Sequence, residues 1–296
     1  MQRSSLTPRS LRRTSQEGQK MRPFVSKRAL LSVAVLTALA ATAGAQMYLG
    51  SSAREERVER ERWSSADARP ASELPPHSFY FTRARYTGGA RGWRSGYNSW
   101  ATDYPKADIQ FLTVLTRLSN IDAYPEDNAV RLDDPDLRRY PFLYALEVGF
   151  MSLTDEEVQG LRNYLLAGGF LMIDDFWGTY QWQNFEREIK RVLPEYPIVE
   201  LPMDHPIFSA MYTVDEIIQV PTVDRGISGA PTFEQDGYVP YARGIFDEHG
   251  RLMVMINWNT DIGDAWEHAE HPLYPLKFST YAFEMGTNAI IYAMTH

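Results

Sequence analysis

The chain has 296 residues, of which 44% are hydrophobic and 13% aromatic, as in an ordinary globular protein. Its formal net charge is −8, and an acidic surface repels phosphate backbones and anionic lipid headgroups, so neither nucleic-acid binding nor peripheral membrane binding is expected. The sequence contains no cysteine, which excludes disulfides, thiol nucleophiles and thiolate metal sites.

Residues 1–45 are predicted to be an export signal. Residues 21–28 are basic, an apolar run of about 13 residues follows, and residues 43–45 form a small-x-small cleavage site. The pattern begins at Met21, which is therefore an alternative start. The run is shorter than the ~20 residues of a membrane-spanning helix, so we expect an exported protein, periplasmic or secreted. An uncleaved anchor in the inner membrane is the alternative.

Cleavage after Ala45 would remove eight basic residues and one acidic residue and would take the net charge from −8 to −15. Residues 46–76 are expected to be a linker, because they carry charges of both signs and end in a proline-containing stretch. Residues 77–296 are expected to form a single domain. Membrane contact is expected only through an uncleaved signal anchor.

Strand-like and helix-like patterns alternate along this domain. Residues 78–83 are rich in β-forming side chains, and a glycine-rich aromatic loop, residues 86–93, follows them. Residues 107–118 place apolar side chains at helical spacing, and residues 142–146 have the pattern of a buried strand. The next segment begins with Thr154 and three acids, a sequence that predicts a capping box at the start of a helix.

This helix is expected to end at Gly168-Gly169, because glycine tolerates the left-handed backbone that closes a helix. Residues 170–173 are apolar on both faces, as expected of a central strand. The remaining segments predict a helix at 185–193, an antiparallel hairpin formed by 239–246 and 251–256, and a final helix at 278–293. The predicted fold class is α/β, with a mainly parallel sheet, helices on both faces and an appended antiparallel hairpin.

Several strings in this domain are distinctive, namely residues 79–83 with Gly88-Gly89, 146–149, 169–177, 205–208, 257–267 and 292–296. Together they resemble a bacterial family called domain of unknown function 4159. The resemblance covers nearly everything after His77, and it implies a flavodoxin-like fold of the class I glutamine amidotransferase-like kind. No activity is established for the family, so the resemblance implies a fold and no reaction.

The sequence departs from the amidotransferases of that fold at one decisive point. Those enzymes use a cysteine at a tight turn between a strand and a helix, and this chain has no cysteine. The amidotransferase reaction is therefore excluded. We expect the corresponding turn at residues 174–178, Asp-Asp-Phe-Trp-Gly.

Asp174 and Asp175 are adjacent, so their side chains point to opposite faces of an extended segment. In one interpretation Asp174 caps the following turn or helix and Asp175 faces solvent. In the other, one of the two lines a cleft at the carboxyl edge of the sheet, as a metal ligand, a general base or an acceptor of sugar hydroxyls. The sequence leaves both interpretations open.

Residues 257–271 are unusually dense in amide, acid, imidazole and indole side chains. If residues 264–271 are helical, Asp264 shares a face with His268, and Glu267 shares a face with His271. Such a set would suit a divalent metal with oxygen and nitrogen ligands. No recognised zinc motif is present, so no cofactor is predicted and the metal remains the weaker interpretation.

Tryptophans beside the strand ends, such as Trp93 and Trp266, are typical of sugar or peptide sites, although buried tryptophans also hold loops in place. His205 precedes a proline, and a lone loop histidine is either a structural hydrogen-bonding group or a catalyst. The candidate catalytic residues are Asp175, His205, Asp264 and Glu267. The candidate ligand-binding residues are Arg83, Trp93, Asp174, Asp175, Trp177, Asn257, Asn259, Asp261 and Trp266.

The sequence favours an exported, amidotransferase-like domain that serves as a binding or assembly module of the bacterial cell envelope. Its partner would be an envelope protein or a saccharide or peptide ligand. The alternative is a hydrolase that acts on an envelope or extracellular saccharide or peptide with these carboxylates, either alone or together with a metal. A third interpretation is a purely structural domain whose motifs hold loops together.

Overall fold

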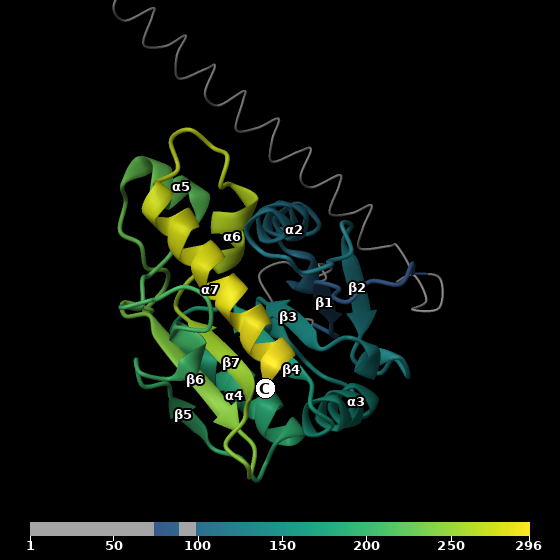
Figure 1. The fold of residues 1–296 in the computed structure, drawn as a ribbon. Helices are drawn as coiled ribbons and strands as arrows, with labels where there is room; N and C mark the ends of the chain where they lie inside the picture. Colours follow the sequence, from purple (N-terminus) through teal and green to yellow (C-terminus); the bar gives the residue numbers. More distant parts are fainter. Residues whose placement is uncertain (1–73, 89–98) are drawn as a thin grey trace, which may run out of the picture. The chain divides into compact units, whose positions relative to one another are not determined.

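The computed structural model describes residues 74–88 and 99–296, which form one seven-stranded sheet with helices on both faces (Figure 1). The predicted signal peptide, most of the predicted linker and Trp93 lie outside the described residues. The strands are β1 (Thr82–Arg85), β2 (Asn128–Arg131), β3 (Phe142–Leu146), β4 (Phe170–Asp174), β5 (Ile198–Glu200), β6 (Tyr241–Phe246) and β7 (Leu252–Trp258). The α-helices are α2 (Lys106–Leu118), α3 (Asp155–Leu166), α4 (Gly178–Val192), α5 (Val223–Ser228), α6 (Ile262–Glu267) and α7 (Leu276–Thr295).

The strand order is β2-β1-β3-β4-β7-β6-β5. The first five strands are parallel, whereas β6 is antiparallel to β7 and β5 is antiparallel to β6. With β7 taking the place of the fifth strand, the parallel part has the flavodoxin-like order 2-1-3-4-5. The predicted α/β class, its mainly parallel sheet and its antiparallel appendage are confirmed.

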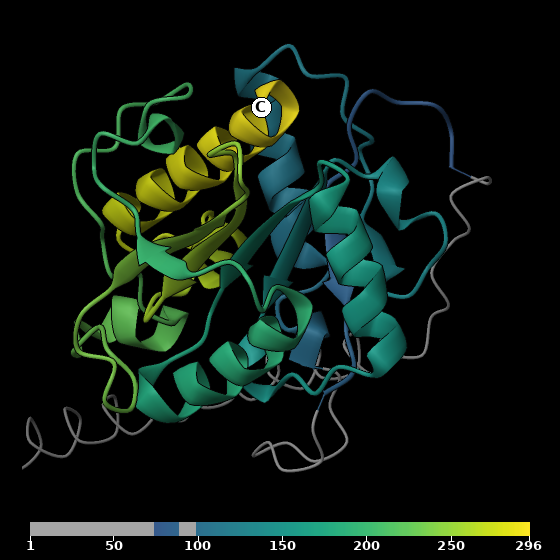
Figure 2. The ribbon, with the colours of Figure 1, turned by 90° about the horizontal axis from the view of Figure 1, so that it is seen from below.

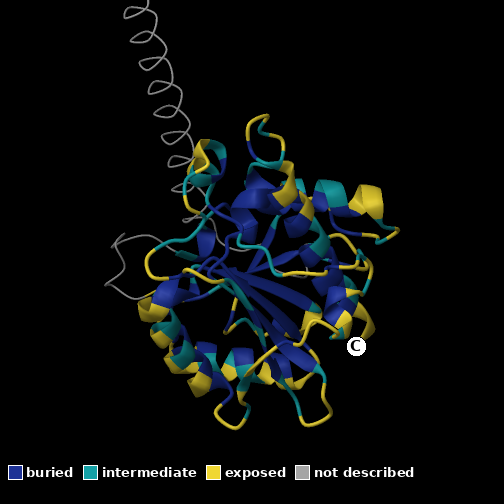
Figure 3. Ribbon diagram, turned by 90° about the vertical axis from the view of Figure 1, so that its left-hand side faces the viewer, coloured by how far each residue is buried: buried dark blue, intermediate teal, exposed yellow. Residues whose placement is uncertain are grey.

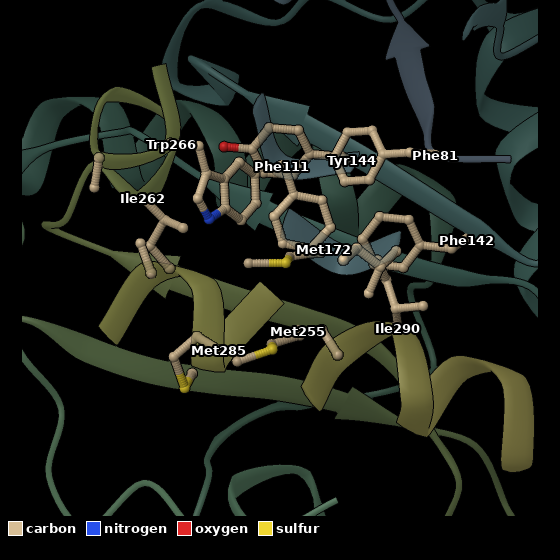
Figure 4. Packing of buried hydrophobic residues seen from close by; sticks show 14 of the residues in the cluster. Phe81, Phe111, Phe142, Tyr144, Met172, Met255, Ile262, Trp266, Met285 and Ile290 are labelled. Carbon is tan, nitrogen blue, oxygen red and sulfur yellow. The ribbon is translucent and has the colours of Figure 1, made fainter. Parts of the chain in front are cut away.

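Two apolar clusters lie on the two faces of the sheet, because successive strand residues point to opposite sides. Tyr144 and Met172 pack with Phe111 of α2 and with side chains of α6 and α7, as Figure 4 shows. Their neighbours Leu143 and Leu171 pack instead with side chains of α3 and α4. Figure 2 shows this two-sided arrangement from below, and Figure 3 shows the buried strands between helices whose outer turns are exposed.

The local predictions around α3 and β4 are confirmed. Thr154 Oγ1 accepts a hydrogen bond from the Glu157 N–H at 3.2 Å, and the Thr154 N–H donates to Glu157 Oε2 at 3.0 Å, which completes the capping box. The chain leaves the helix through Gly168, whose φ is 109°. All five residues of β4 are buried, as expected of a central strand covered by helices on both sides.

Other boundaries differ from the predictions because distant residues set them. Helix α4 begins seven residues before the predicted start at residue 185, because the Gly178 N–H donates to the side chain of Asn259. Strand β1 begins at Thr82 rather than residue 78, and Phe79 forms only an isolated bridge. Strands β2 and β5 were not predicted from the sequence. Within residues 74–88 and 99–296, no helix combines the length and apolar character needed to cross a membrane.

Candidate functional site

Three neighbouring parallel strands end in a left-handed residue that is not glycine. Glu147 follows β3 with a φ of 53°, Asp175 follows β4 with a φ of 48°, and Asn259 follows β7 with a φ of 61°. This conformation costs a non-glycine residue about 1–3 kcal/mol and concentrates at functional sites. Ligands of open α/β folds bind at this same carboxyl edge of the sheet, so the edge is the first candidate for a site.

Backbone hydrogen bonds join these strand ends to one another. The Glu147 N–H donates to the Asp175 carbonyl at 3.0 Å, and the Asp175 N–H donates to the Thr260 carbonyl at 3.1 Å. The Asn259 N–H donates to the Phe176 carbonyl at 3.0 Å. Main-chain contacts between three strands therefore help to hold the edge.

Three aspartates form the centre of this edge. Asp103, from the loop before α2, also has a positive φ, 59°. Oxygens of Asp103, Asp175 and Asp261 lie within 4.8 Å of one another, and the three residues are 7%, 8% and 3% exposed. Two unit charges at that separation repel each other by about 3 kcal/mol at an effective dielectric constant of about 20. Such a group favours a bound proton or a bound cation.

Hydrogen bonds fix the orientation of two of these carboxylates. Asp175 Oδ1 accepts from Trp177 Nε1 at 3.0 Å, and Asp261 Oδ1 accepts from the Asp264 N–H at 2.8 Å. Burial, and then the negative charges of Glu147 and other neighbours, raise the pKa of Asp175 well above its usual range. Burial, and then the charge of Asp175, likewise raise the pKa of Asp261.

Asp174 lies beside this cluster and is completely buried. Its Oδ2 accepts hydrogen bonds from the N–H groups of Ile262 and Gly263 at 2.7 and 3.0 Å and from the Tyr144 hydroxyl at 2.9 Å. Burial raises the pKa of Asp174 to about 7. Asp174 thus caps a helix, but the helix is α6 rather than the following α4. The interpretation in which Asp175 faces solvent was wrong, because Asp175 is 8% exposed and its Oδ1 accepts a hydrogen bond from Trp177 Nε1.

Arg83 is buried within the domain rather than presented to the site. It forms an ion pair with Asp108 of α2, and both side chains are fully buried. Its Nη1 also donates to the carbonyls of Trp100 and Thr102, at 3.3 and 2.9 Å. Arg83 therefore holds the loop that carries Asp103, which makes it a positioning residue.

A second titratable cluster lies on α6. His268 Nε2 is 3.4 Å from Glu267 Oε2 and 3.7 Å from Asp264 Oδ1. Burial lowers the pKa of His268, but the two carboxylates outweigh burial and raise it overall. The predicted sharing of a face by Glu267 and His271 does not arise, because α6 ends at Glu267. His271 Nδ1 instead accepts from the Leu273 N–H.

Other candidates have structural contacts. Asn257 Nδ2 donates to the Ile173 carbonyl at 3.0 Å, and Asn259 bonds both the Gly178 N–H and the Val239 carbonyl. Trp266 is fully buried against Phe111 and Tyr144 in the core seen in Figure 4, so it presents no face to a ligand. Trp177 is 2% exposed and acts through its bond to Asp175.

His205 lies at the opposite edge of the sheet. Its Nδ1 accepts from the Ile207 N–H, and its ring packs against Phe246, the last residue of β6. Because β6 is antiparallel to β7, Phe246 lies beside the first residue of β7, far from the strand's carboxyl end. The structure therefore does not bring His205 together with the aspartates.

Two residues of the site were missed in the sequence. Glu147 directly follows a predicted strand, and that position alone was a signal for the carboxyl edge. Asp103 carried a weaker signal, since it precedes a predicted helix after a long glycine-rich loop. Its place in the cluster depends on the bonds from Arg83 to the loop.

Comparison with family models assigns the chain to a family. The family model described as domain of unknown function (DUF4159) matches residues 82–294, which include every strand and α-helix described above except the last residue of α7. A search of curated proteins found no match. The match spans more than half of the chain, and the chain therefore belongs to the DUF4159 family.

Proposed function

We propose that this protein is an exported ligand-binding module of the bacterial cell envelope, without amidotransferase activity. One observation carries the proposal. Three adjacent strand ends are locked by backbone bonds in a costly conformation and gather buried carboxylates where this architecture binds ligands. Export is proposed from the signal pattern of residues 21–45, and the missing cysteine removes the amidotransferase nucleophile.

The carboxylates narrow the chemistry of the ligand. An ionised carboxylate only accepts hydrogen bonds, so the ligand must present donors, such as the hydroxyls of a saccharide or the amines and amides of a peptide. Half-buried aromatic rings lie at the same edge. Trp258 ends β7, its ring centroid is 4.6 Å from that of Trp182, and the Arg243 guanidinium lies 4.3–4.7 Å from both rings. This arrangement supports a saccharide or peptide ligand that contacts both the carboxylates and these aromatic rings.

Hydrolysis of the same class of ligand is the second candidate function. A carboxyl group whose pKa is about 7, as at Asp174, is suited to proton transfer at neutral pH. Against this candidate, glycosidases hold two carboxyl groups about 5–10 Å apart on either side of the scissile bond. The three aspartates are closer together and at most 8% exposed, which favours binding over cleavage.

The test is a pull-down in which the purified protein and its Asp175→Asn variant are immobilised, and the partners or ligands that each retains are identified. Native envelope extract, a glycan panel and a peptide panel serve as sources. We expect a partner or ligand that the wild type and the exposed-site control Asp215→Asn retain and that Asp175→Asn loses. A monomer by size exclusion that retains nothing from any source would contradict the proposal. Conversion of a retained ligand that Asp174→Asn abolishes would establish the hydrolase instead.

A further inference from the structure

We propose that Asp103, Asp175 and Asp261 bind one hard divalent cation of the Mg²⁺, Mn²⁺ or Ca²⁺ kind at the carboxyl edge of the sheet. The three carboxylates each offer an oxygen within 4.8 Å of the others. Ligand oxygens around one such ion, at about 2.0–2.6 Å from it, are at most about 4–5 Å apart. A set made only of carboxylate oxygens, without imidazole or thiolate, is the ligand type that suits these hard cations.

The hydrogen bonds of two of these residues leave a ligand oxygen on each. Trp177 Nε1 and the Asp264 N–H bond the Oδ1 atoms of Asp175 and Asp261, while neither Oδ2 receives a hydrogen bond from the residues that the structure describes. Metal-binding carboxylates are held in this way, with one oxygen bonded to the protein. The site is thus oriented without the ion.

Asp174, the chain neighbour of Asp175, supplies a second and independent observation. Asp174 Oδ1 is buried and has no hydrogen-bond partner within residues 74–88 and 99–296. Its Oδ2 is held by the Gly263 N–H, and a Cβ added to Gly263 would lie 2.7 Å from Asp103 Oδ2. Asp174 and Asp103 therefore approach the same residue. A buried acceptor without a donor is costly, and a water bound to the cation would supply one.

Two of the three carboxylates, those of Asp175 and Asp261, have no basic partner among the residues that the structure describes, so a cation would supply their counter-charge. Arg83 is committed to Asp108, and neither Asp175 nor Asp261 forms an ion pair within the described part of the chain. The cluster of Asp264, Glu267 and His268 differs, because its imidazole supplies the counter-charge from within. The three aspartates are therefore the stronger metal site.

This inference rests on the proposed role of the carboxyl edge as a binding site, but its test needs no saccharide, peptide or partner. Failure of the cation and failure of the larger ligand are therefore separate results. The chelator-treated protein is titrated with MgCl2, MnCl2 and CaCl2 by calorimetry, with Mn²⁺ electron paramagnetic resonance as a second readout. We expect one ion per chain and a higher Tm when it binds.

The variants locate the ion. Asp175→Asn and Asp261→Asn are each expected to weaken binding at least about tenfold, as the loss of a ligand-shell contact typically does. Two control variants are expected to bind the ion within about twofold of the wild-type affinity. One is Glu156→Gln, in an exposed acidic pocket that Asp133, Asp134 and Asp155 also line. The other is His268→Gln, in the neighbouring cluster. Thermal melts in chelator check that each variant folds. If Asp175→Asn or Asp261→Asn does not fold, Asp103→Asn is used in its place.

Two results would overturn the inference. One is the absence of binding by all three cations at millimolar concentration. The other is binding that survives in the folded aspartate variants or that Glu156→Gln or His268→Gln abolishes, since the ion would then lie elsewhere.

Discussion

The main-chain N–H of Glu147 donates a 3.0 Å hydrogen bond to the main-chain carbonyl of Asp175, which joins the end of β3 to the end of β4. Both residues have positive φ values, 53° and 48°. Because the backbone fixes this edge, an isosteric change in an aspartate side chain alters its charge without moving the strand ends. The site can therefore be tested by single substitutions.

Asp175→Asn is expected to stabilise the ion-free protein. The folded-state pKa of Asp175 is raised by burial and by neighbouring carboxylates, so ionisation of this carboxyl group opposes folding, and asparagine cannot ionise. The gain should be about 1–2 kcal/mol in the free energy of unfolding, measured by urea denaturation in chelator. The exposed control Asp215→Asn should change it by less than about 0.5 kcal/mol. An Asp175→Asn variant less stable than this control would show that ionisation of Asp175 does not destabilise the folded protein.

Asp174 makes a pH-dependent contribution to stability. Its pKa rises from 3.8 to about 7 on folding, so the folded protein binds the extra proton between these values. The contribution of Asp174 is full below pH 4 and is lost as the pH rises through 7. The difference in unfolding free energy between wild type and Asp174→Asn should therefore fall from about pH 4 to about pH 7 and then level off. Urea denaturation across this range checks the sign, and a difference that rises with pH contradicts it.

His268 also makes a pH-dependent contribution to the stability of the folded protein, but over a different pH range. Its folded-state pKa is raised overall because Glu267 and Asp264 outweigh burial, so the stabilisation is full below the ordinary value of 6.5. It is lost as the pH rises through the folded-state value. His268→Gln should therefore be destabilising at pH 6 and much less so at pH 9. The exposed His249→Gln serves as the control in the same denaturation experiments, and an equal effect of both variants would exclude a stabilising ion pair of His268 with Glu267 and Asp264.

Substitutions of Arg83 and Asp108 should have strongly non-additive effects on the free energy of unfolding. Arg83→Met leaves a buried carboxylate without its partner, a change that costs about 3–5 kcal/mol. Asp108→Leu combined with Arg83→Met removes both charges and should recover most of that loss. The exposed pair of Lys190 with Glu186 is the comparison, and Lys190→Met should cost less than about 1 kcal/mol. A double variant no more stable than Arg83→Met alone would contradict this account.

The sequence predicted those elements whose determinants are local. The capping box at Thr154, the glycine exit at residue 168 and the apolar run of β4 all lie within a few residues of the boundary that they set. The start of α4 could not be predicted in this way, because its cap comes from Asn259, 81 residues away. Asp174 likewise caps α6 across 88 residues.

The candidate site was predicted in part for the same reason. Asp175 and Asp261 each follow a predicted strand or its turn, and parallel strands bring such residues to one edge. Asp103 follows no strand directly, and it reaches the cluster through a loop held by Arg83. His205 has a side chain suited to acid–base chemistry, but it lies at the opposite edge of the sheet from the aspartates. The sequence could not place it, because its position depends on the antiparallel direction of β6.

A crystal structure of the protein soaked in MnCl2, with anomalous diffraction at the manganese edge, tests the central claim most directly. The account predicts one peak among the carboxylates of Asp103, Asp175 and Asp261, with ligand distances of about 2.0–2.6 Å. A peak confined to the exposed acidic pocket at Asp133, or the absence of any peak in crystals of the folded protein, would contradict it.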